Sequence, residues 1–504
     1  MAEQLAAIVV GAGFSGLAAG IQLKRAGIHN FVILEKADGV GGTWRDNHYP
    51  GAACDIPSHL YSYSFEPNPK WQRAYGGQPE ILAYLEHCAD KYGLRPHLVL
   101  GAKVANATFD DASATWRVRI ADGRTFVGRA LVMGNGALHL PAVPELPGRE
   151  TFAGASWHSA RWNHGYDLRG KRVGVVGTGA SAIQFVPAIA PRVGSMAVFQ
   201  RTPPWIVPKA DRVMRDSERW MLEHLPGAHW LRRTGLYWLM ESRVLGFAFA
   251  PRVYQWAEQL VLKNLERVVR DPALRARLTP DYRLGCKRVL ISNDYYPALQ
   301  RDNVALVTDA ISRIEPRGIR TADGRLHELD AIVWGTGFKV VDYLSAIEVV
   351  GAGGVRLADA WRDSIRNFLG INVSGFPNLF LLMGPNTGLG HNSMIFMIEA
   401  QVHYAVEAIL AMHRNGLAAL DVRPEVENAF RGELAGKLKG TVWTSGCSSW
   451  YMAPNGDVLL WPGFTFDYWR RTRRIRLTDY QQRALAHTTH VNDEAMVRPT
   501  ALAI

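Results

Sequence analysis

Short apolar runs alternate with helix-like stretches in two separate parts of the chain. In the first part, an apolar run at residues 7–10 is followed by a helix-like stretch at 15–25 and a second apolar run at 31–34. The same order recurs where apolar runs at 173–176 and 196–199 flank another helix-like stretch. Short apolar runs bounded by glycine are typical of buried parallel strands, and their alternation with helices indicates β-α-β units. The pattern predicts an α/β protein with two mostly parallel, helix-covered sheets.

The segment at residues 216–285 interrupts this alternation. It is rich in Trp, Leu, Arg and Glu, and its pattern predicts helices. Apolar runs at 331–334 and 379–382 then predict strands that return to the two sheets. We therefore predict that residues 1–145 and 377–480 form a first nucleotide-binding domain, that 146–215 and 286–376 form a second one with a linker, that 216–285 are a helical insertion in the second, and that 481–504 are a C-terminal extension.

Glycine is frequent in this chain, with 48 residues, and a first glycine cluster directly follows a predicted strand. It places Gly11, Gly13 and Gly16 at G-x-G-x-x-G spacing, with Ser15 inside the turn. Such glycines permit a tight turn, close approach of the backbone to a pyrophosphate and close packing of the next helix, whose N-terminus favours phosphate. Glu35 ends the next predicted strand, where a carboxylate binds ribose hydroxyls. These residues predict a Rossmann-like site for an adenosine diphosphate group without a 2′-phosphate.

A second glycine cluster follows the strand predicted at 173–176. It contains Gly177, Thr178, Gly179 and Ser181, and it ends in alanine, which the fingerprint permits. At the position where the first site has its carboxylate, this site has Arg201. A guanidinium suits a 2′-phosphate, whereas a carboxylate repels one. The inverted charge therefore predicts an adenosine diphosphate without a 2′-phosphate at the first site and NADPH at the second.

Two dinucleotide sites in one chain predict two cofactors that exchange electrons. NADPH must pass its hydride to an acceptor, and FAD is the usual one. This leaves a reductase, an oxygenase or a disulfide oxidoreductase. The last class needs a redox cysteine pair, and none of the four cysteines forms a C-x-x-C pair or has metal-ligand spacing. We therefore predict no metal site, no disulfide framework and a reducing compartment, the cytoplasm.

The formal net charge of +11 raises the question of an anionic partner. Much of the excess is local, because five arginines lie at residues 470–476. A solvated basic segment explains this better than a nucleic-acid site, so we predict no nucleic-acid partner. The apolar stretch at 5–23 lacks the basic start of a signal peptide, and no other apolar run is long enough to cross a bilayer without charges. We expect a soluble protein without a membrane span, and the sequence leaves its oligomeric state open.

A third motif lies between the two glycine clusters. Residues 152–162 match F-x-G-x-x-x-H-x-x-x-W, with Phe152, Gly154, His158 and Trp162 at the fixed positions. This stretch resembles the fingerprint of type I Baeyer–Villiger monooxygenases, where it also lies between two nucleotide motifs. Flavin-containing and N-hydroxylating monooxygenases resemble the pattern but usually lack the final tryptophan. For His158, the resemblance implies a role in coupling the domains rather than in proton transfer.

Most of the chain before residue 480 resembles the same family. Residues 41–44 look like its flavin-contacting loop, 49–55 like its active-site acid segment and 285–288 like its Lys-Arg pair. The resemblance implies two catalytic residues, Arg288 as a fixed cation beside the flavin and Asp55 as the acid that orients it. It further assigns these residues to cofactor binding: Gly42, Thr43, Trp44, Asp55, Tyr61 and Val104 at the flavin, and Ser181, Gln184, Arg201, Thr202, Lys287 and Trp450 at NADP.

The resemblance implies an enzyme that uses FAD, NADPH and O2 to convert ketones to esters or lactones through a peroxide at the flavin C4a atom. That peroxide must stay deprotonated to attack a carbonyl carbon, and an arginine favours the anion because it keeps its own charge. Three alternatives stay open: a monooxygenase that oxidises sulfides or amines, an oxidase-like reductase that releases hydrogen peroxide, and a non-catalytic protein that senses nucleotides or binds nucleic acid. For the aromatic residues of the helical insertion, the sequence allows a packed core, a substrate tunnel or a membrane-touching face.

Overall fold

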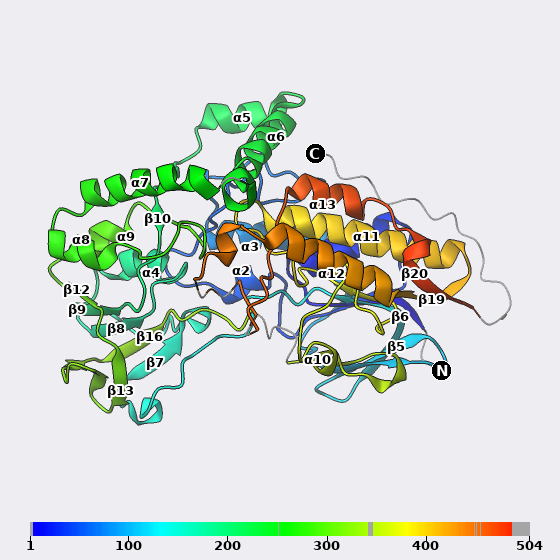
Figure 1. Cartoon of the computed structure of the whole chain (residues 1–504), viewed down its shortest axis with the longest axis horizontal. Coiled ribbons are helices and arrows are strands. Elements are labelled where there is room, and N and C mark those ends of the chain that lie inside the picture. Colours follow the sequence, from blue (N-terminus) through cyan, green and yellow to red (C-terminus); the bar gives the residue numbers. More distant parts are fainter. Residues whose placement is uncertain are drawn as a thin grey trace.

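The computed structural model describes residues 4–249, 251–340, 346–447, 449, 451–453 and 455–485, with the backbone alone at 251–253. Two sheets lie toward opposite ends of the molecule, and helices cover them (Figure 1). The central strands of both sheets are parallel, because crossover helices return the chain to the same end of the sheet. The predicted α/β class with two Rossmann-like sheets is confirmed.

The first sheet joins a parallel half to an antiparallel half. Its central strand pairs in parallel on both sides, and burial on both faces explains why it is a continuous apolar run. In spatial order the strands are β17 (Glu348–Val350), β4 (Val104–Asp110), β5 (Thr115–Ile120), β6 (Thr125–Met133), β1 (Leu5–Val10), β2 (Phe31–Leu34) and β3 (Leu98–Val99), with β18 (Leu379–Leu381) also paired to β6.

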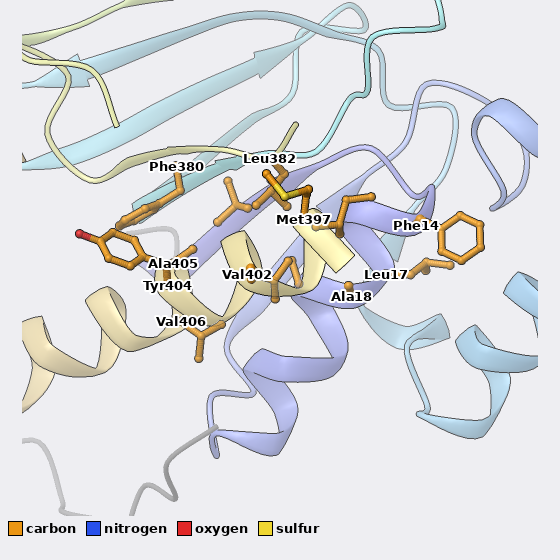
Figure 2. Packing of buried hydrophobic residues seen from close by; sticks show 14 of the residues in the cluster. Phe14, Leu17, Ala18, Phe380, Leu382, Met397, Val402, Tyr404, Ala405 and Val406 are labelled. Atoms are coloured by element: carbon orange, nitrogen blue, oxygen red, sulfur yellow. The ribbon is translucent and has the colours of Figure 1, made fainter. Parts of the chain in front are cut away.

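Helices α1 (Phe14–Arg25) and α11 (Met394–Arg414) pack against each other and the sheet in a large apolar cluster (Figure 2). Leu17 of α1 and Val402 of α11 belong to this cluster. Among the described residues, α11 is the one helix long and apolar enough to cross a bilayer, but 83% of its apolar window is buried inside the protein. Its composition is explained by its place in the core. The other helices of this domain are α2 (Thr43–Asp46), α3 (Gln78–Lys91), α10 (Leu357–Ala360), α12 (Pro424–Leu438) and α13 (Thr465–Thr472).

The second sheet is parallel throughout and encloses its own core with flanking helices. In spatial order its strands are β12 (Val304–Val307), β9 (Ser195–Phe199), β8 (Arg172–Val176), β16 (Ala331–Trp334) and β7 (Ala155–His158), and its helices include α4 (Ala182–Ile189) and α9 (Tyr295–Leu299). Smaller pairings are made by β10 (Ile206–Val207) with β11 (Leu290–Ile291), and by β13 (Ile311–Glu315), β14 (Gly318–Thr321) and β15 (Leu326–Glu328).

The predicted helical insertion consists of α5 (Asp216–His224), α6 (Ala228–Glu241), a π-helical turn at Leu245–Phe249, α7 (Pro251–Val268) and α8 (Pro272–Leu278). These helices contact both domains. On α6, Tyr237 joins the apolar core of the first domain, and Arg233 donates to the backbone carbonyls of His59 and Ser62 at 3.1 and 2.9 Å. Residues of α7 and α8, by contrast, pack in the core of the second domain. The insertion therefore connects the two domains to each other.

Two predicted domain boundaries are wrong. Strand β17 pairs with β4 of the first sheet, so the chain has re-entered the first domain by Glu348 rather than at residue 377. A three-residue strand carries too little pattern to show which sheet edge it joins. The extension predicted to begin at residue 481 instead continues β20 (Tyr480–Ala484), which pairs antiparallel with β19 (Leu417–Val422).

One disulfide is present, which the prediction of no disulfide framework did not anticipate. Cys286 and Cys447 are bonded, with their Cα atoms 6.2 Å apart and a sequence separation of 161 residues. Cys54 and Cys88 are buried free thiols. Because the bonded cysteines are far apart in the sequence, no local spacing could indicate the pair; the folded chain brings them together.

A buried carboxylate fixes the end of α6 in the first domain. Glu241 is fully buried and accepts hydrogen bonds from the Asn392 side chain at 2.6 Å and the Thr465 hydroxyl at 2.8 Å. We expect Glu241→Ala to leave these donors unsatisfied and to cost about 2–3 kcal/mol of stability. Thermal unfolding followed by circular dichroism should show a lower melting temperature.

Glu266→Ala is the matched control, because Glu266 is an exposed glutamate on α7 of the same insertion. Its melting temperature should equal that of the unmodified protein. Equal melting temperatures for both variants would show that the buried carboxylate does not hold α6 in place.

Candidate functional site

One cavity of about 1150 Å³ lies between the two domains and is lined by both glycine turns. It begins where β1 and β8 end, since ligands of open α/β sheets bind at the carboxyl ends of the strands. The predicted site residues that line it are Gly11, Gly13, Ser15, Glu35, Gly42, Thr43, Trp44, Asp55, Tyr61, Gly177, Thr178, Gly179, Ser181, Gln184, Arg201, Thr202, Lys287 and Arg288.

Several glycines of the two turns are required by the protein's own packing. Gly11 and Gly177 have φ angles of +95° and +102°, which residues with a side chain rarely adopt. A Cβ at Gly16 would lie 1.7 Å from the backbone oxygen of Gly11, so α1 can approach the strand only through glycine. Gly16 therefore serves the third role of the fingerprint, close helix packing, and it does not line the cavity.

The middle glycine of each turn has a different reason to be glycine. A Cβ on Gly13 would come no closer than 3.6 Å to other protein atoms, and a Cβ on Gly179 no closer than 4.0 Å. Both residues line the cavity. The protein itself would therefore accept a side chain at either position. The absence of one fits a ligand that needs the space, as the pyrophosphate of a dinucleotide does.

Glu35 also has a structural role that the sequence did not reveal. Its carboxylate accepts hydrogen bonds from the backbone N–H groups of Ala12 at 2.8 Å and Ala37 at 3.0 Å, and Arg45 lies 3.4 Å from it. These contacts hold the first turn against the next loop. The same side chain lines the cavity, so its predicted contact with a ribose would be made by a carboxylate that is already fixed in place.

The second turn faces a group of cations. Arg201 and Thr202 line the cavity after β9, and Lys287 joins them from a segment after the insertion. Burial, and then the charge of Arg201, lower the pKa of Lys287. Two cations placed together repel each other unless an anion lies between them. This arrangement suits the 2′-phosphate of NADP.

Arg288 and Asp55 meet in the cavity from the two different domains. The Nε atom of Arg288 donates to Oδ2 of Asp55 at 3.0 Å, and its Nη2 atom donates to the same oxygen. The charge of Asp55 raises the pKa of Arg288, so the guanidinium keeps its charge at every working pH. Tyr451, which also lines the cavity, lies beside Arg288 and was not predicted as a site residue. Its place directly after the predicted Trp450 was the available signal.

Gln184 connects the domains beside this ion pair. Its side-chain oxygen accepts from the Tyr49 hydroxyl at 2.9 Å, and its amide donates to the backbone carbonyl of Ala53 at 2.9 Å. Gln184 belongs to α4 of the second domain, whereas Tyr49 and Ala53 belong to the segment that carries Asp55. The predicted cofactor residue Gln184 thus also positions the acid segment against the second domain.

The residues of the third motif form a joint outside the cavity. The Nε2 atom of His158 donates to the backbone oxygen of Gly337 at 2.9 Å, and the Trp162 ring packs on Phe185 of α4. A Cβ on Gly154 would lie 2.5 Å from the backbone oxygen of Asp330. Phe152 packs against the apolar cluster on the other face of the second sheet. These contacts support a structural role in joining segments, and none of the four motif residues lines the cavity.

Two other predicted residues are not in the observed lining. The Val104 side chain lies in an apolar core cluster, so any contact that Val104 makes with a cofactor must use its backbone. Trp450 lies outside the described residues. The lining also contains residues that the prediction missed, among them Gly134, whose backbone oxygen would lie 2.7 Å from a Cβ on Gly11. The glycine cluster at 134–136 after the β6 run was the signal for it.

Comparison with known proteins identifies the family to which this chain is related. Residues 8–215 match a family model described as pyridine nucleotide-disulphide oxidoreductase. A protein of Pseudomonas aeruginosa named Baeyer-Villiger monooxygenase is 46% identical over 94% of this chain and 90% of its own length. One of the same name from Streptomyces coelicolor is 46% identical over 95% of this chain and 93% of its own.

Solved structures extend the likeness to the whole fold. An oxidized steroid monooxygenase bound to NADP has a TM-score of 0.87 and 31% identity, covering 96% of this chain and all of that one. Cyclohexanone monooxygenase from Rhodococcus sp. Phi1 bound to NADP⁺ has a TM-score of 0.87 and 29% identity, covering 96% of this chain and 100% of that one. A structure named OTEMO in complex with FAD and NADP has a TM-score of 0.85 and 28% identity, covering 93% and 97%.

The disulfide chemistry in the family model's description has no counterpart in the matched range. The two cysteines within residues 8–215 are Cys54 and Cys88, and both are buried and unbonded. The two-turn cavity with its half-buried ion pair agrees instead with the full-length relatives, whose matches cover more than nine-tenths of this sequence. The chain belongs to the Baeyer–Villiger monooxygenase family.

Proposed function

We propose that this enzyme uses FAD, NADPH and O2 to convert ketones into esters or lactones. The observation that carries the proposal is the ion pair between Arg288 and Asp55, which lies in the same cavity as the two glycine turns. As a member of its family, the chain is an FAD-dependent monooxygenase that uses NADP. The choice of a ketone as substrate rests on the permanent cation, because a cation favours attack by an oxygen anion on a carbonyl carbon.

The two turns would divide the cofactors by charge. The first turn, with the Glu35 carboxylate, suits the unphosphorylated ribose of FAD, whereas Arg201 and Lys287 suit the 2′-phosphate of NADPH. When bound, FAD accepts a hydride from NADPH and activates O2 at its ring. Because a single cavity contains both turns, the nicotinamide and the flavin ring can meet inside the protein.

Arg288 would act as the fixed positive charge beside the reacting oxygen. A guanidinium stabilises negative charge that develops on that oxygen and on the carbonyl oxygen of the substrate. Asp55 orients the guanidinium through its Nε and Nη2 atoms. Tyr451 lies beside the same guanidinium and limits the orientations that the guanidinium can adopt.

An assay of ketones beside sulfides tests the reaction class. The purified flavin-loaded enzyme is given linear, cyclic and aromatic ketones, and aryl alkyl sulfides, with NADPH and air. We expect ketone-dependent NADPH consumption with an ester or lactone as product. Sulfoxide formation without any ester from the whole ketone panel would favour the alternative, and NADPH consumption matched only by hydrogen peroxide would indicate an oxidase.

The first variant tests the guanidinium. We expect Arg288→Ala to keep FAD reduction by NADPH, because neither glycine turn is altered, but to lower ester formation by at least about a hundredfold, the effect of removing one oxyanion-stabilising donor. Stopped-flow absorbance measures reduction, and gas chromatography measures the ester.

Arg301→Ala is the matched control, because Arg301 is an exposed arginine whose Nε atom donates only to Asn303, at 3.3 Å. It should form ester at the normal rate. Normal ester formation by the Arg288 variant would remove Arg288 from the proposed reaction.

The second variant tests the choice of nucleotide. We expect Arg201→Ala to raise the KM for NADPH by about tenfold, because a charge-assisted contact with the 2′-phosphate is lost. NADH has no 2′-phosphate and is the internal control, so its KM should change little. Steady-state flavin reduction with each nucleotide gives both values, and an equal change for both would contradict the assignment of Arg201.

A further inference from the structure

Large apolar side chains are exposed along one edge of the molecule. Figure 1 shows α5, α6, α7 and α13 along the upper edge, with α5 and α6 standing out from the body of the protein. Leu231 on α6 and Trp256 on α7 are the most exposed of these side chains, at 67% and 68%. We call these exposed side chains of the insertion and α13 the apolar edge; they are Trp220, Met221, Leu225, Trp230, Leu231, Trp238, Leu239, Leu245, Phe249, Trp256, Leu260 and Phe466.

Helix α6 has its polar and apolar faces reversed relative to an ordinary surface helix. Within α6, which the structure describes in full, the exposed residues are Trp, Leu and Gly at positions 230, 231, 235, 238 and 239, and none is charged. Its arginines turn toward the protein: Arg233 donates to backbone carbonyls of the first domain, and Arg232 lies 3.6 Å from Glu218. A solvent-facing helix normally shows the opposite arrangement. The reversal indicates that something other than water covers this face.

The apolar edge continues onto α13 without a break. The ring centroids of Trp238 and Phe466 are 6.5 Å apart, and those of Phe249 and Phe464 are 5.4 Å apart. Phe466 is the second residue of α13. At a rise of 1.5 Å per residue, the end of this helix lies roughly 10 Å further along. The C-terminal arginines therefore follow within about two helical turns of the apolar contact with α6.

Exposed positive charge adjoins the apolar residues at this end. Arg470, Arg473 and Arg474 on and just after α13 are exposed, and Arg476 follows them. Asp467, the acid of α13, pairs with Arg470 at 3.3 Å, with Arg471 at 3.0 Å and with Lys437 at 3.6 Å, so the excess charge rests on the arginines that follow α13. The arginines thus carry a local positive excess, in a chain whose formal net charge is +11. An anionic surface would complement it.

We propose that the apolar edge binds the surface of a bilayer that contains anionic phospholipid, without spanning it. Exposed tryptophans favour the boundary between headgroups and acyl chains, and nearby arginines favour anionic headgroups. The projecting shape of α5 and α6 suits insertion into a soft surface better than a flat protein contact. The edge also adjoins the active-site segment, because Phe247 of the π-helical turn packs in one cluster with Cys286 and Tyr451. A lipophilic substrate could then reach the enzyme from the bilayer.

Sedimentation with vesicles tests the proposal on the full-length, flavin-loaded protein. The probes are vesicles of phosphatidylcholine alone and vesicles of phosphatidylcholine and phosphatidylglycerol in equal parts. We expect binding to the mixed vesicles that weakens when salt is raised from 0.1 M to 1 M, where the screening length falls from about 10 Å to about 3 Å. We expect much weaker binding to phosphatidylcholine alone.

The double variant Leu231→Ser and Trp256→Ser removes the two most exposed side chains of the edge. It should weaken binding to mixed vesicles by about tenfold or more, since binding scales with the apolar area inserted. Arg474→Glu should reduce the salt dependence. The matched control is the double variant Leu100→Ser and Val355→Ser, which removes two exposed apolar side chains, at 39% and 47%, from the first domain away from the edge. This control should bind as the unmodified protein does.

Three results would overturn the proposal. One is the absence of vesicle binding by a protein that retains its flavin. Another is equal weakening by the edge variant and by the control. The third is a dimer, seen by size-exclusion chromatography, that becomes a monomer in the edge variant while neither form binds vesicles. The apolar edge would then be covered by a second copy of the chain. The melting temperature and flavin absorbance of each variant show that a loss of binding does not come from unfolding.

Discussion

The ion pair between Arg288 and Asp55 is the interaction on which the architecture of the site depends. Asp55 belongs to the first domain and Arg288 follows the helical insertion, 233 residues later. A guanidinium partly removed from water needs an opposite charge, so each residue requires the other for a stable position. The pair can form only when the two domains are docked. The hydrogen bonds of Gln184 with Tyr49 and Ala53 of the acid segment hold that docking in place.

The segments that surround the pair are themselves fixed. Cys286 stands two residues before Arg288, and its bond to Cys447 ties the Lys-Arg segment to the loop that brings Tyr451. On another side, Glu241 of α6 holds Asn392, which lines the cavity. The insertion is therefore part of the contact between the two domains. It ties α6 to the first domain and α7 to the second, so the relative placement of the two glycine turns follows from its packing.

Charge is distributed in this molecule according to separate tasks. The Glu35 carboxylate stabilises the first turn through backbone N–H groups and keeps a negative charge at one end of the cavity. Arg201 and Lys287 give the other end a positive charge. The arginines at the end of α13 do not line the cavity, and the start of the same helix contacts Trp238 of the insertion through Phe466. The basic excess of the chain thus has at least two locations, and each is matched to a different kind of anionic group.

The sequence by itself determined the two β-α-β units, the glycine turns and the opposite charges of Glu35 and Arg201. These features are local, because a positive φ angle, a close helix approach or a strand end is decided by residues near one another in the chain. The family resemblance added Arg288 and Asp55 as residue types at known places. Only the tertiary structure decided that Arg288 and Asp55 touch, that Gln184 hydrogen-bonds to Tyr49 and that Cys286 is bonded to Cys447. It also decided that β17 joins the first sheet and that the apolar face of α6 is exposed. Each of these depends on how distant segments pack, and a contact between residues more than a hundred positions apart leaves no trace in the local pattern of either one.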